Sequence, residues 1–297
     1  MLPAPEPTPT SARLRTGSPA LVANRPRLMR PRLLTSFARK TPPALLAFVA
    51  LLASGDACAT NGGSGDTTSA AQSSAAAPAT PASAGVGQPN VLTVEETAAG
   101  WRLLFDGTTT TGWRGYKQTG MPNGWRVENG TLTKPDGTED ILTTDQFGDF
   151  ELAIDWRIGT GGNSGIFYRG SEEFERVYWS APEYQLLDDA NARDGRNRLT
   201  SAASAYGLYA APAGIVKPAG EWNTTRIVAK GAHVEHWLNG QKVVQYELWS
   251  PDWEAKVKAS KFNEWPKYGR GKSGHVAIQG DHEGVLALRN IKIRALP

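Results

Sequence analysis

The chain has 297 residues, of which 32 are basic and 29 acidic, for a formal net charge of +3. The first 60 residues contain eight of the basic and two of the acidic residues, which leaves 24 basic and 27 acidic residues in the rest. The basic excess is therefore confined to the N-terminal part, and the remainder has no Lys/Arg block of the kind that binds nucleic acid.

Composition changes sharply near residue 91. The residues before it are mainly Pro, Ala, Ser, Thr and Gly with scattered Arg, whereas all ten Trp and all four His follow residue 100. Only the second part can bury a sizeable core, and its length of about 200 residues suits one domain. We therefore expect an N-terminal extension with a signal peptide (1–60), a low-complexity linker (61–94) and one folded domain (95–297).

An apolar run, Ala44–Ala53, follows the basic residues Arg30, Arg32, Arg39 and Lys40. A basic region, an apolar stretch of about 7–15 residues and small residues beyond it define a secretory signal. The run is too short to cross a bilayer as a helix. Export to the periplasm or the cell envelope is therefore expected.

Cys58 is the only cysteine, so it forms no internal disulfide. It lies just after the apolar run, where a bacterial lipoprotein would carry its lipid, although Gly55 and Asp56 replace the small apolar residues that such a site prefers. Lipidation of Cys58 and cleavage near Ala59 stand as alternatives. Contact with a membrane is expected only through such a lipid anchor.

Short segments of alternating apolar and polar residues, separated by turns, fill most of the chain after residue 95, with one short helix near 94–99. The segments lie at 150–157, 165–169, 183–186, 225–229, 233–238, 241–244, 275–279 and 286–295. Asn239-Gly240 joins two of them and is the strongest short hairpin signal. About ten to thirteen short strands predict an all-β fold, an antiparallel β-sandwich or jelly roll. Residues 249–268, with four Lys and two Pro, are expected to form a long surface loop with a helical turn.

Several segments occur in the order that one known family shows. They are Trp101–Gly107 with Gly112-Trp113, Trp125–Leu132, Phe150–Arg157, Gly161–Arg169, Glu183–Asp189, Glu221–Asn223, Leu238–Gly240 and Gly274–Arg294. On these segments the chain resembles the 3-keto-disaccharide hydrolase family, and GGNSGIFYR at Gly161–Arg169 is the most specific of them. The resemblance implies a concanavalin A-like jelly roll and activity on 3-keto-glycosides, which carry a ketone at C3. One extra residue separates Gln279 from His282 relative to the family's usual ending.

Side chains alternate across a strand, so Glu183 and Gln185 share one face of theirs. Asp188 returns to that face only if a bulge intervenes. Two carboxylates beside a Gln on one strand suit glycosidic chemistry. The alternative is that Glu183 and Asp188 are solvated residues on an exposed sheet face.

Asn163 and Arg169 share one face of another strand, with a Gly between them where a ligand can approach the backbone. Arg169 would orient a ligand oxygen, or it pairs with a structural acid such as Glu151. Gln279 and Arg289 are further candidates for substrate binding.

A ketone at C3 acidifies the proton at C2, so a base can remove it and the group at C1 can leave by β-elimination. The step needs a base, an acid for the leaving oxygen and a stabiliser for the enolate oxygen. Glu183 or His282 is the expected base or acid, with Asp188 as a second carboxylate. Arg169, Gln185 or a divalent cation is the expected stabiliser, and Glu183, Asp188 and His282 are chemically suited to hold such a cation.

The aromatic residues divide into two sets. Those in strand-like segments are expected in the core: Trp156, Trp222 and Trp237. Those in loops are candidates for a sugar-binding platform: Trp179, Trp253 and Trp265. His233 and His236, which flank a hairpin, are expected at the surface.

Three functions fit these residues. The first is an enzyme that cleaves 3-keto-glycosides, the second is a carbohydrate-binding β-sandwich without catalysis, and the third is an ordinary retaining glycosidase. Binding alone would tolerate the loss of Glu183, whereas catalysis would not. An ordinary glycosidase would also cleave the unoxidised glycoside.

Overall fold

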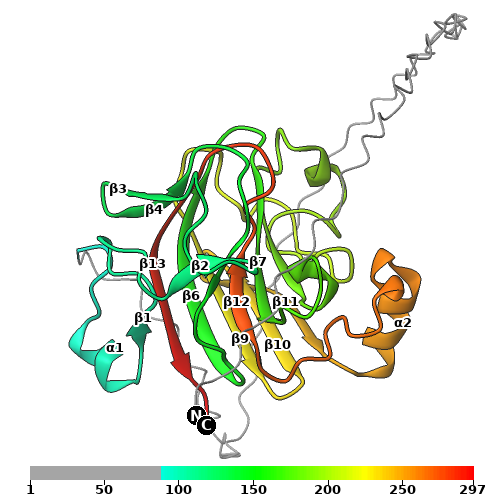
Figure 1. Ribbon diagram of the computed structural model, residues 1–297. Coiled ribbons are helices and arrows are strands. Elements are labelled where there is room, and N and C mark those ends of the chain that lie inside the picture. Colours follow the sequence, from blue (N-terminus) through cyan, green and yellow to red (C-terminus); the bar gives the residue numbers. More distant parts are fainter. Residues whose placement is uncertain (1–87) are drawn as a thin grey trace, which may run out of the picture. The chain divides into compact units, whose positions relative to one another are not determined.

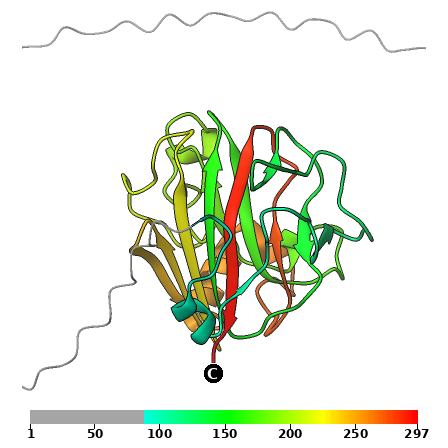
Figure 2. The same cartoon turned by 90° about the vertical axis from the view of Figure 1, so that its left-hand side faces the viewer.

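The computed structural model describes residues 88–297; the predicted signal segment, Cys58 and most of the predicted linker lie outside them. Within this part, two antiparallel sheets are packed face to face (Figure 1). The all-β antiparallel sandwich predicted from the sequence is thereby confirmed. Figure 2 turns the sandwich so that strands β6 and β13, which are far apart in the sequence, are seen side by side.

The larger sheet has eight strands. Their order is β11 (Gln241–Glu247), β10 (His233–Leu238), β9 (Asn223–Lys230), β6 (Phe150–Ile158), β13 (Leu286–Ala295), β4 (Thr131–Lys134) and β3 (Arg126–Glu128), and β1 (Arg102–Leu103) also pairs with β13. The smaller sheet has the order β2 (Trp113–Gly115), β5 (Ile141–Thr143), β12 (His275–Ile278), β7 (Asn163–Gly170) and β8 (Glu183–Leu187).

The core lies between the two sheets and follows the period of two in the sequence. On β6, Phe150, Leu152, Ile154 and Trp156 are fully buried, and Ile166, Tyr184, Leu186 and others meet them from the smaller sheet. Burying each such side chain contributes about 1.5–3 kcal/mol. The turn at Asn239-Gly240 has φ angles of 50° and 82° and joins Leu238 directly to Gln241 across the hairpin. This left-handed backbone is the one that Asn and Gly adopt most easily.

Two helices flank the sandwich. Helix α1 (Val94–Ala98) matches the short helix expected there, and Thr93 and Glu96 form its capping box. Helix α2 (Pro251–Ala259) and a 3-10 turn, Lys261–Glu264, occupy the segment that was expected to leave the strand pattern.

A stack of aromatic rings fixes that segment to the sandwich. Ring centroids lie 5.2 Å apart between Tyr246 and Trp253, 5.9 Å between Trp253 and Tyr268, and 4.0 Å between Tyr268 and Phe262. Because Trp253 is fully buried, it is a core residue and not the sugar platform that its loop position suggested.

Residues ahead of position 95 also pack on the sandwich. The backbone N–H of Asn90 donates to Asn290 Oδ1 (2.6 Å), and the backbone N–H of Asn290 donates to Asn90 Oδ1 (2.8 Å). The Asn90 amide donates further to the carbonyl of Gly130 (2.8 Å). The packed part of the chain thus begins near Asn90, slightly before the predicted domain boundary.

Three other expectations about burial are wrong. His236 is fully buried, where its ring lies 3.0 Å from Tyr168 Oη and 3.1 Å from the carbonyl of Ala203, because its strand position faces the core. Trp237 alternates to the outer face and is half-buried beneath Arg226, whose guanidinium lies 3.8 Å from the ring centroid. Trp222 is also half-buried, while Trp156 is in the core as predicted.

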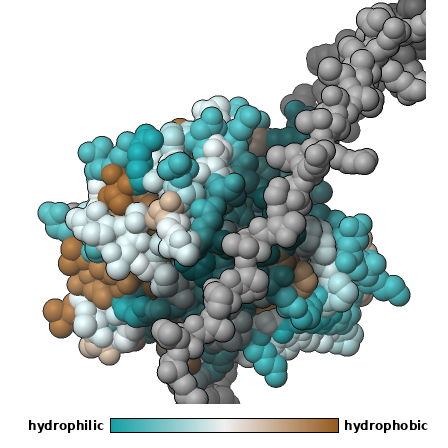
Figure 3. Space-filling view, viewed as in Figure 1, coloured by the Kyte–Doolittle hydropathy of each residue, from teal (hydrophilic) through white to brown (hydrophobic). Residues whose placement is uncertain are grey.

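The surface seen in Figure 3 is mostly polar, with hydrophobic residues in small separate patches. Among residues 88–297, no helix is both long and apolar enough to cross a bilayer.

Candidate active site

A pocket of about 290 Å³ opens on the outer face of the smaller sheet, the face turned away from the core. It is lined by Asn163, Tyr178, Glu183, Gln185, Asp194, Tyr206, Lys261, Trp265, Gln279, Asp281 and His282. Five of these are site residues predicted from the sequence: Asn163, Glu183, Gln185, Gln279 and His282. Residues more than 100 positions apart thus meet at one end of the sheet.

Strand alternation explains why the polar residues of β8 reach the pocket. Tyr184 and Leu186 point into the core, so Glu183 and Gln185 point outward. Gly165 on β7 pairs with Gln185, and its carbonyl accepts the N–H of Gln279 at 2.9 Å. Gly165 therefore lies at the centre of the sheet face that forms the base of the pocket.

The side chain of Glu183 lies across Gly165. A Cβ at position 165 would be 2.8 Å from Glu183 Cγ and closer still to Oε1. The only residue that leaves room for the carboxyl in this position is glycine.

The Glu183 carboxyl is almost completely enclosed, with an exposed fraction of 6%. Burial raises its pKa to about 8; Lys261 opposes the rise, and the carboxylates of Asp140, Asp281 and Asp194 add to it. A carboxyl of this kind exchanges a proton near neutral pH, which is what a general acid or base requires.

Three carboxamides surround this carboxyl. Asn163 Oδ1, Gln185 Oε1 and Gln279 Oε1 are buried and have no hydrogen-bond partner among the described residues. Gln185 Nε2 donates to the carbonyl of Thr200 at 3.3 Å, so its oxygen is turned the other way. A buried acceptor without a partner costs about 1–3 kcal/mol, and such groups call for an explanation. Hydroxyl groups of a bound ligand would supply the missing donors.

The rim of the pocket is aromatic and charged. Trp265 stacks on Trp179 with a centroid distance of 5.6 Å and an interplanar angle of 15°, and it meets Tyr178 edge-on at 5.6 Å. Tyr206 Oη donates to Asp194 Oδ2 at 3.3 Å. Flat rings beside hydrogen-bonding groups suit the apolar and polar sides of a sugar. The side chain of His282 is 46% exposed and lies 4.0 Å from Asp281.

Asp188 is not among the residues that line the pocket. Strand β8 pairs with β7 without a register shift, so the bulge that would bring Asp188 to the Glu183 face is missing. Instead Asp188 accepts hydrogen bonds from the backbone N–H of Gly161 (2.8 Å) and from Asn191 Nδ2 (2.8 Å). Burial acts to raise the pKa of Asp188, but these hydrogen bonds outweigh it and hold the pKa below the ordinary value. Its observed contacts are those of a residue that fixes a loop.

Arg169 is also turned away from the pocket. Its φ angle is 54°, and the facing strand β12 shifts register between His275 and Ala277, so strict alternation is lost. The guanidinium is buried and donates to the carbonyls of Gly148 (2.9 Å) and Gly231 (2.8 Å) and to Asp149 Oδ1 (2.9 Å). Arg169 thus pairs with a structural acid, although the acid is Asp149 and not Glu151.

Arg289 belongs to the other sheet. It lies on β13, with its guanidinium 4.1 Å from the ring centroid of Trp222 and its Nε 3.5 Å from Asp155 Oδ2. Arg157 covers Trp222 at 4.9 Å. Arg157, Trp222 and Arg289 border a separate groove of about 400 Å³ on the outer face of the larger sheet.

The residues suggested as metal ligands are not brought together. Glu183 and His282 line the pocket, but Asp188 is held by the loop at Gly161. Within residues 88–297 no three His, Cys, Asp or Glu side chains are grouped closely enough to hold a metal ion.

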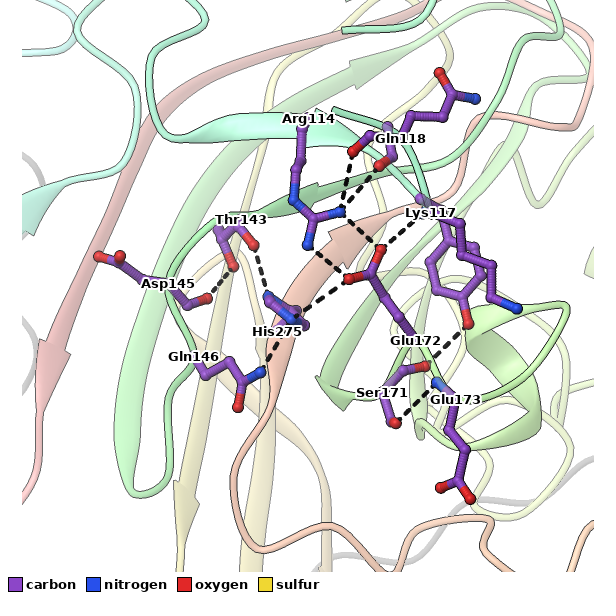
Figure 4. Close-up of polar contacts among 12 residues, drawn as sticks. Arg114, Lys117, Gln118, Thr143, Asp145, Gln146, Ser171, Glu172, Glu173 and His275 are labelled. Atoms are coloured by element: carbon purple, nitrogen blue, oxygen red, sulfur yellow. Dashed lines mark hydrogen bonds and ion pairs between the residues drawn. The ribbon is translucent and has the colours of Figure 1, made fainter. Parts of the chain in front are cut away.

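A second polar cluster lies on the smaller sheet and is drawn in Figure 4. His275 Nδ1 donates to the carbonyl of Thr143 (2.7 Å), which leaves Nε2 as the acceptor that faces Gln146 Nε2 at 3.1 Å. Glu172 lies 4.0 Å from the same ring and accepts two hydrogen bonds from Arg114, at 2.6 and 2.7 Å. These groups pair with one another, and none of their side-chain atoms is buried without a hydrogen-bond partner, in contrast to the Glu183 pocket.

Five lining residues were not predicted from the sequence: Tyr178, Asp194, Tyr206, Lys261 and Asp281. They lie in loops between strands, where no periodic pattern indicates which side chains face inward. The long interruption at 249–268 was the one signal, since it supplies Lys261 and Trp265.

Comparisons with known proteins show which family the chain belongs to. The profile of the family described as "3-keto-alpha-glucoside-1,2-lyase-like domain" matches residues 100–294. A 3-keto-disaccharide hydrolase of Bacteroides thetaiotaomicron is 34% identical over 231 residues, which cover 67% of this chain and 79% of that protein.

Two crystal structures of provisionally assigned glycosyl hydrolases from Parabacteroides distasonis are similar in fold. The first has a TM-score of 0.67 at 35% identity and covers 71% of this chain and 100% of that one. The second has a TM-score of 0.52 at 27% identity and covers 66% of this chain and 99% of that one. The chain therefore belongs to the family of 3-keto-α-glucoside-1,2-lyase-like domains and is a carbohydrate-active enzyme of the glycoside hydrolase or lyase type.

Proposed function

We propose that the protein cleaves the glycosidic bond of 3-keto-glycosides, with Glu183 as the base. The observation that supports this most directly is the Glu183 carboxyl, which is buried in a pocket and has a pKa raised to about 8. The family and the 34% identical 3-keto-disaccharide hydrolase point to the substrate class.

The chemistry begins at C2 of the oxidised sugar. The Glu183 carboxylate takes the C2 proton, and the electron pair of that bond forms an enolate with the C3 oxygen. When the enolate collapses, C3=O is restored, C1=C2 forms and the bond from C1 to the leaving oxygen breaks. His282 lies at the rim of the pocket and is our candidate to protonate that oxygen. Addition of water to the unsaturated product then completes a hydrolysis without any net oxidation or reduction.

Three carboxamide side chains that line the pocket would hold the sugar during this step. The unpaired oxygens of Asn163, Gln185 and Gln279 accept hydrogen bonds from sugar hydroxyls, which converts an unfavourable feature of the free protein into binding energy. Trp265 offers a ring face or edge to the apolar side of the sugar or its aglycone. The pocket would thus both orient the sugar and place its C2 proton within reach of Glu183.

The test is incubation with a 3-keto-glucoside and, separately, with its unoxidised parent, followed by mass analysis of the products. Only the keto substrate should be cleaved. Glu183→Gln keeps the shape of the side chain but removes the base, so turnover should fall by at least about 10²-fold while binding measured by calorimetry changes little.

Glu175→Gln is the matched control, because the Glu175 side chain is 80% exposed and does not line the pocket; it should retain full activity. Equal cleavage of the unoxidised parent would indicate an ordinary glycosidase. Near-full activity of Glu183→Gln would remove Glu183 from the chemistry, and binding without any turnover by the wild type would favour a binding module.

A further inference from the structure

Lys261 is the one Lys or Arg side chain among the described residues that line the Glu183 pocket. It begins the 3-10 turn after α2, where Ser260 Oγ accepts the N–H of Phe262 at 3.1 Å. Its Nζ lies 4.5 Å from the ring centroid of Tyr206 and 5.7 Å from that of Tyr178. No carboxylate of residues 88–297 forms an ion pair with it.

The turn that carries Lys261 is firmly anchored. Phe262 is buried and stacks on Tyr268 at 4.0 Å, and Tyr268 stacks on the buried Trp253. Tyr206 and Tyr178 then direct the flexible lysine stem over the pocket through cation–π contacts. Lys261 is therefore placed by its surroundings, although no acid holds it.

The reaction proposed above needs a positive group or strong donors at the C3 oxygen. Negative charge develops on that oxygen when the C2 proton leaves, and preorganised charge there is among the largest contributions to catalysis. The two arginines considered for a ligand role, Arg169 and Arg289, lie outside the pocket. Gln185 Nε2 already donates to the carbonyl of Thr200 at 3.3 Å, and Lys261 is the one positively charged side chain that lines the pocket among the described residues.

We propose that Lys261 donates a hydrogen bond from its ammonium group to the C3 oxygen and stabilises the enolate that forms when Glu183 takes the C2 proton. This role rests on the proposed function. The C2 proton passes to Glu183, its bonding electrons enter the enolate, and Lys261 keeps its own protons throughout. The positive charge of Lys261 also opposes the burial that raises the pKa of Glu183, so base and stabiliser are electrostatically linked.

The test compares Lys261→Met and Lys261→Arg with Lys258→Met as the matched control. Lys258 is an exposed lysine three positions earlier and does not line the pocket. Two rates are measured on a 3-keto-glucoside: cleavage, and exchange of the C2 proton in deuterated water. Lys261→Met should lower both kcat values by about 10²–10³-fold with a change in KM below about threefold, and Lys261→Arg should recover part of the loss.

The pH dependence of kcat/KM distinguishes this role from a merely structural one, which would leave that pH dependence unchanged. Removal of the positive charge should shift the Glu183 limb of kcat/KM to higher pH in Lys261→Met, and leave it in place in Lys258→Met. If wild type cleaves the keto substrate and Lys261→Met matches it in both rates, the assignment of Lys261 is overturned while the proposed function stands. If wild type neither exchanges nor cleaves, both fail.

Discussion

Opposing local effects determine the pKa of the Glu183 carboxyl. Enclosure by the sheet and the neighbouring loops disfavours its charged form, and Asp140, Asp281 and Asp194 act in the same direction. Lys261 partly reverses the effect. The missing side chain of Gly165 makes the position sterically available. The result is a carboxyl whose proton is exchangeable near neutral pH, a property that no residue of this site produces alone.

The raised pKa makes a prediction about stability. The folded protein holds the Glu183 proton up to about pH 8, whereas an unfolded chain loses it near the ordinary value of 4.5. Unfolding therefore releases a proton between these values, so stability falls as pH rises through this window, by an amount on the order of a few kcal/mol. Below about pH 4.5 both the folded and the unfolded chain hold this proton, so the stabilisation is complete and no longer changes with pH.

Glu183→Gln has no such proton. Thermal unfolding of both proteins from pH 5 to pH 8.5 should show the wild type losing Tm relative to the variant as pH rises. A Tm difference that stays constant over the whole range would mean that Glu183 is not desolvated in solution. In the same window, cleavage by the wild type should increase with pH, because the carboxylate form is the base.

Residues 249–268, which contain α2 and the 3-10 turn, have two roles that the sequence does not separate. Trp253 and Trp265 both lie in it, yet Trp253 is fully buried in the aromatic stack and Trp265 lines the pocket. One ring fixes the segment on the sandwich, and the other contacts the space where a ligand would sit. The difference arises because α2 turns one side toward Tyr246 and Tyr268, while Trp265 follows the 3-10 turn on the pocket side.

Substitution of these two residues should therefore separate stability from binding. Trp253→Ala leaves a cavity and should lower the free energy of unfolding by about 3–5 kcal/mol, measured by chemical denaturation. Trp265→Ala should lower it by much less and weaken substrate binding by about 2–10-fold, the range expected for one lost ring contact. Equal destabilisation by both substitutions, or unchanged binding in Trp265→Ala, would contradict this division.

The outer faces of the two sheets carry different surface features. The smaller sheet carries the pocket on its outer face, whereas the larger sheet carries the groove that Arg289 and Trp222 border. Of the residues expected to bind substrate, Arg289 is thus separated from Glu183 by the full thickness of the core. Gln279 and Arg289 are only ten residues apart, yet they lie on opposite faces because β12 belongs to the smaller sheet and the next strand, β13, belongs to the larger one.

Export concerns the residues ahead of the sandwich. The basic residues and the apolar run at Ala44–Ala53 predict that the protein leaves the cytoplasm, and Cys58 or the neighbourhood of Ala59 is the expected processing site. Cell fractionation should find the processed protein in the envelope or periplasm. Full-length, uncleaved protein in the cytoplasm would contradict export. Fatty-acid labelling that depends on Cys58, lost in Cys58→Ala, would identify a lipid anchor.

The sequence was sufficient wherever a local rule applies. Period-two alternation gave the strands, Asn239-Gly240 gave a hairpin, and the motifs at Gly161–Arg169 and Glu183–Asp189 led to Asn163, Glu183 and Gln185. The strands and the hairpin depend only on neighbours in the chain, because successive side chains on a regular strand must point to opposite faces. Asn163, Glu183 and Gln185 came from the family resemblance together with this alternation, and all three line the pocket. His282 was also reached, despite the extra residue before it.

The tertiary structure decided where the strand alternation breaks and which loop side chains reach the pocket. A left-handed residue turns Arg169 into the loops at Gly148 and Gly231, and the absence of a bulge keeps Asp188 away from Glu183. Lys261 reaches the pocket only because distant rings anchor its turn. Such outcomes depend on contacts between segments far apart in the sequence, and on burial, which sets both the pKa of Glu183 and the unpaired carboxamides. No local pattern encodes those quantities, since they exist only once the two sheets and their loops are packed.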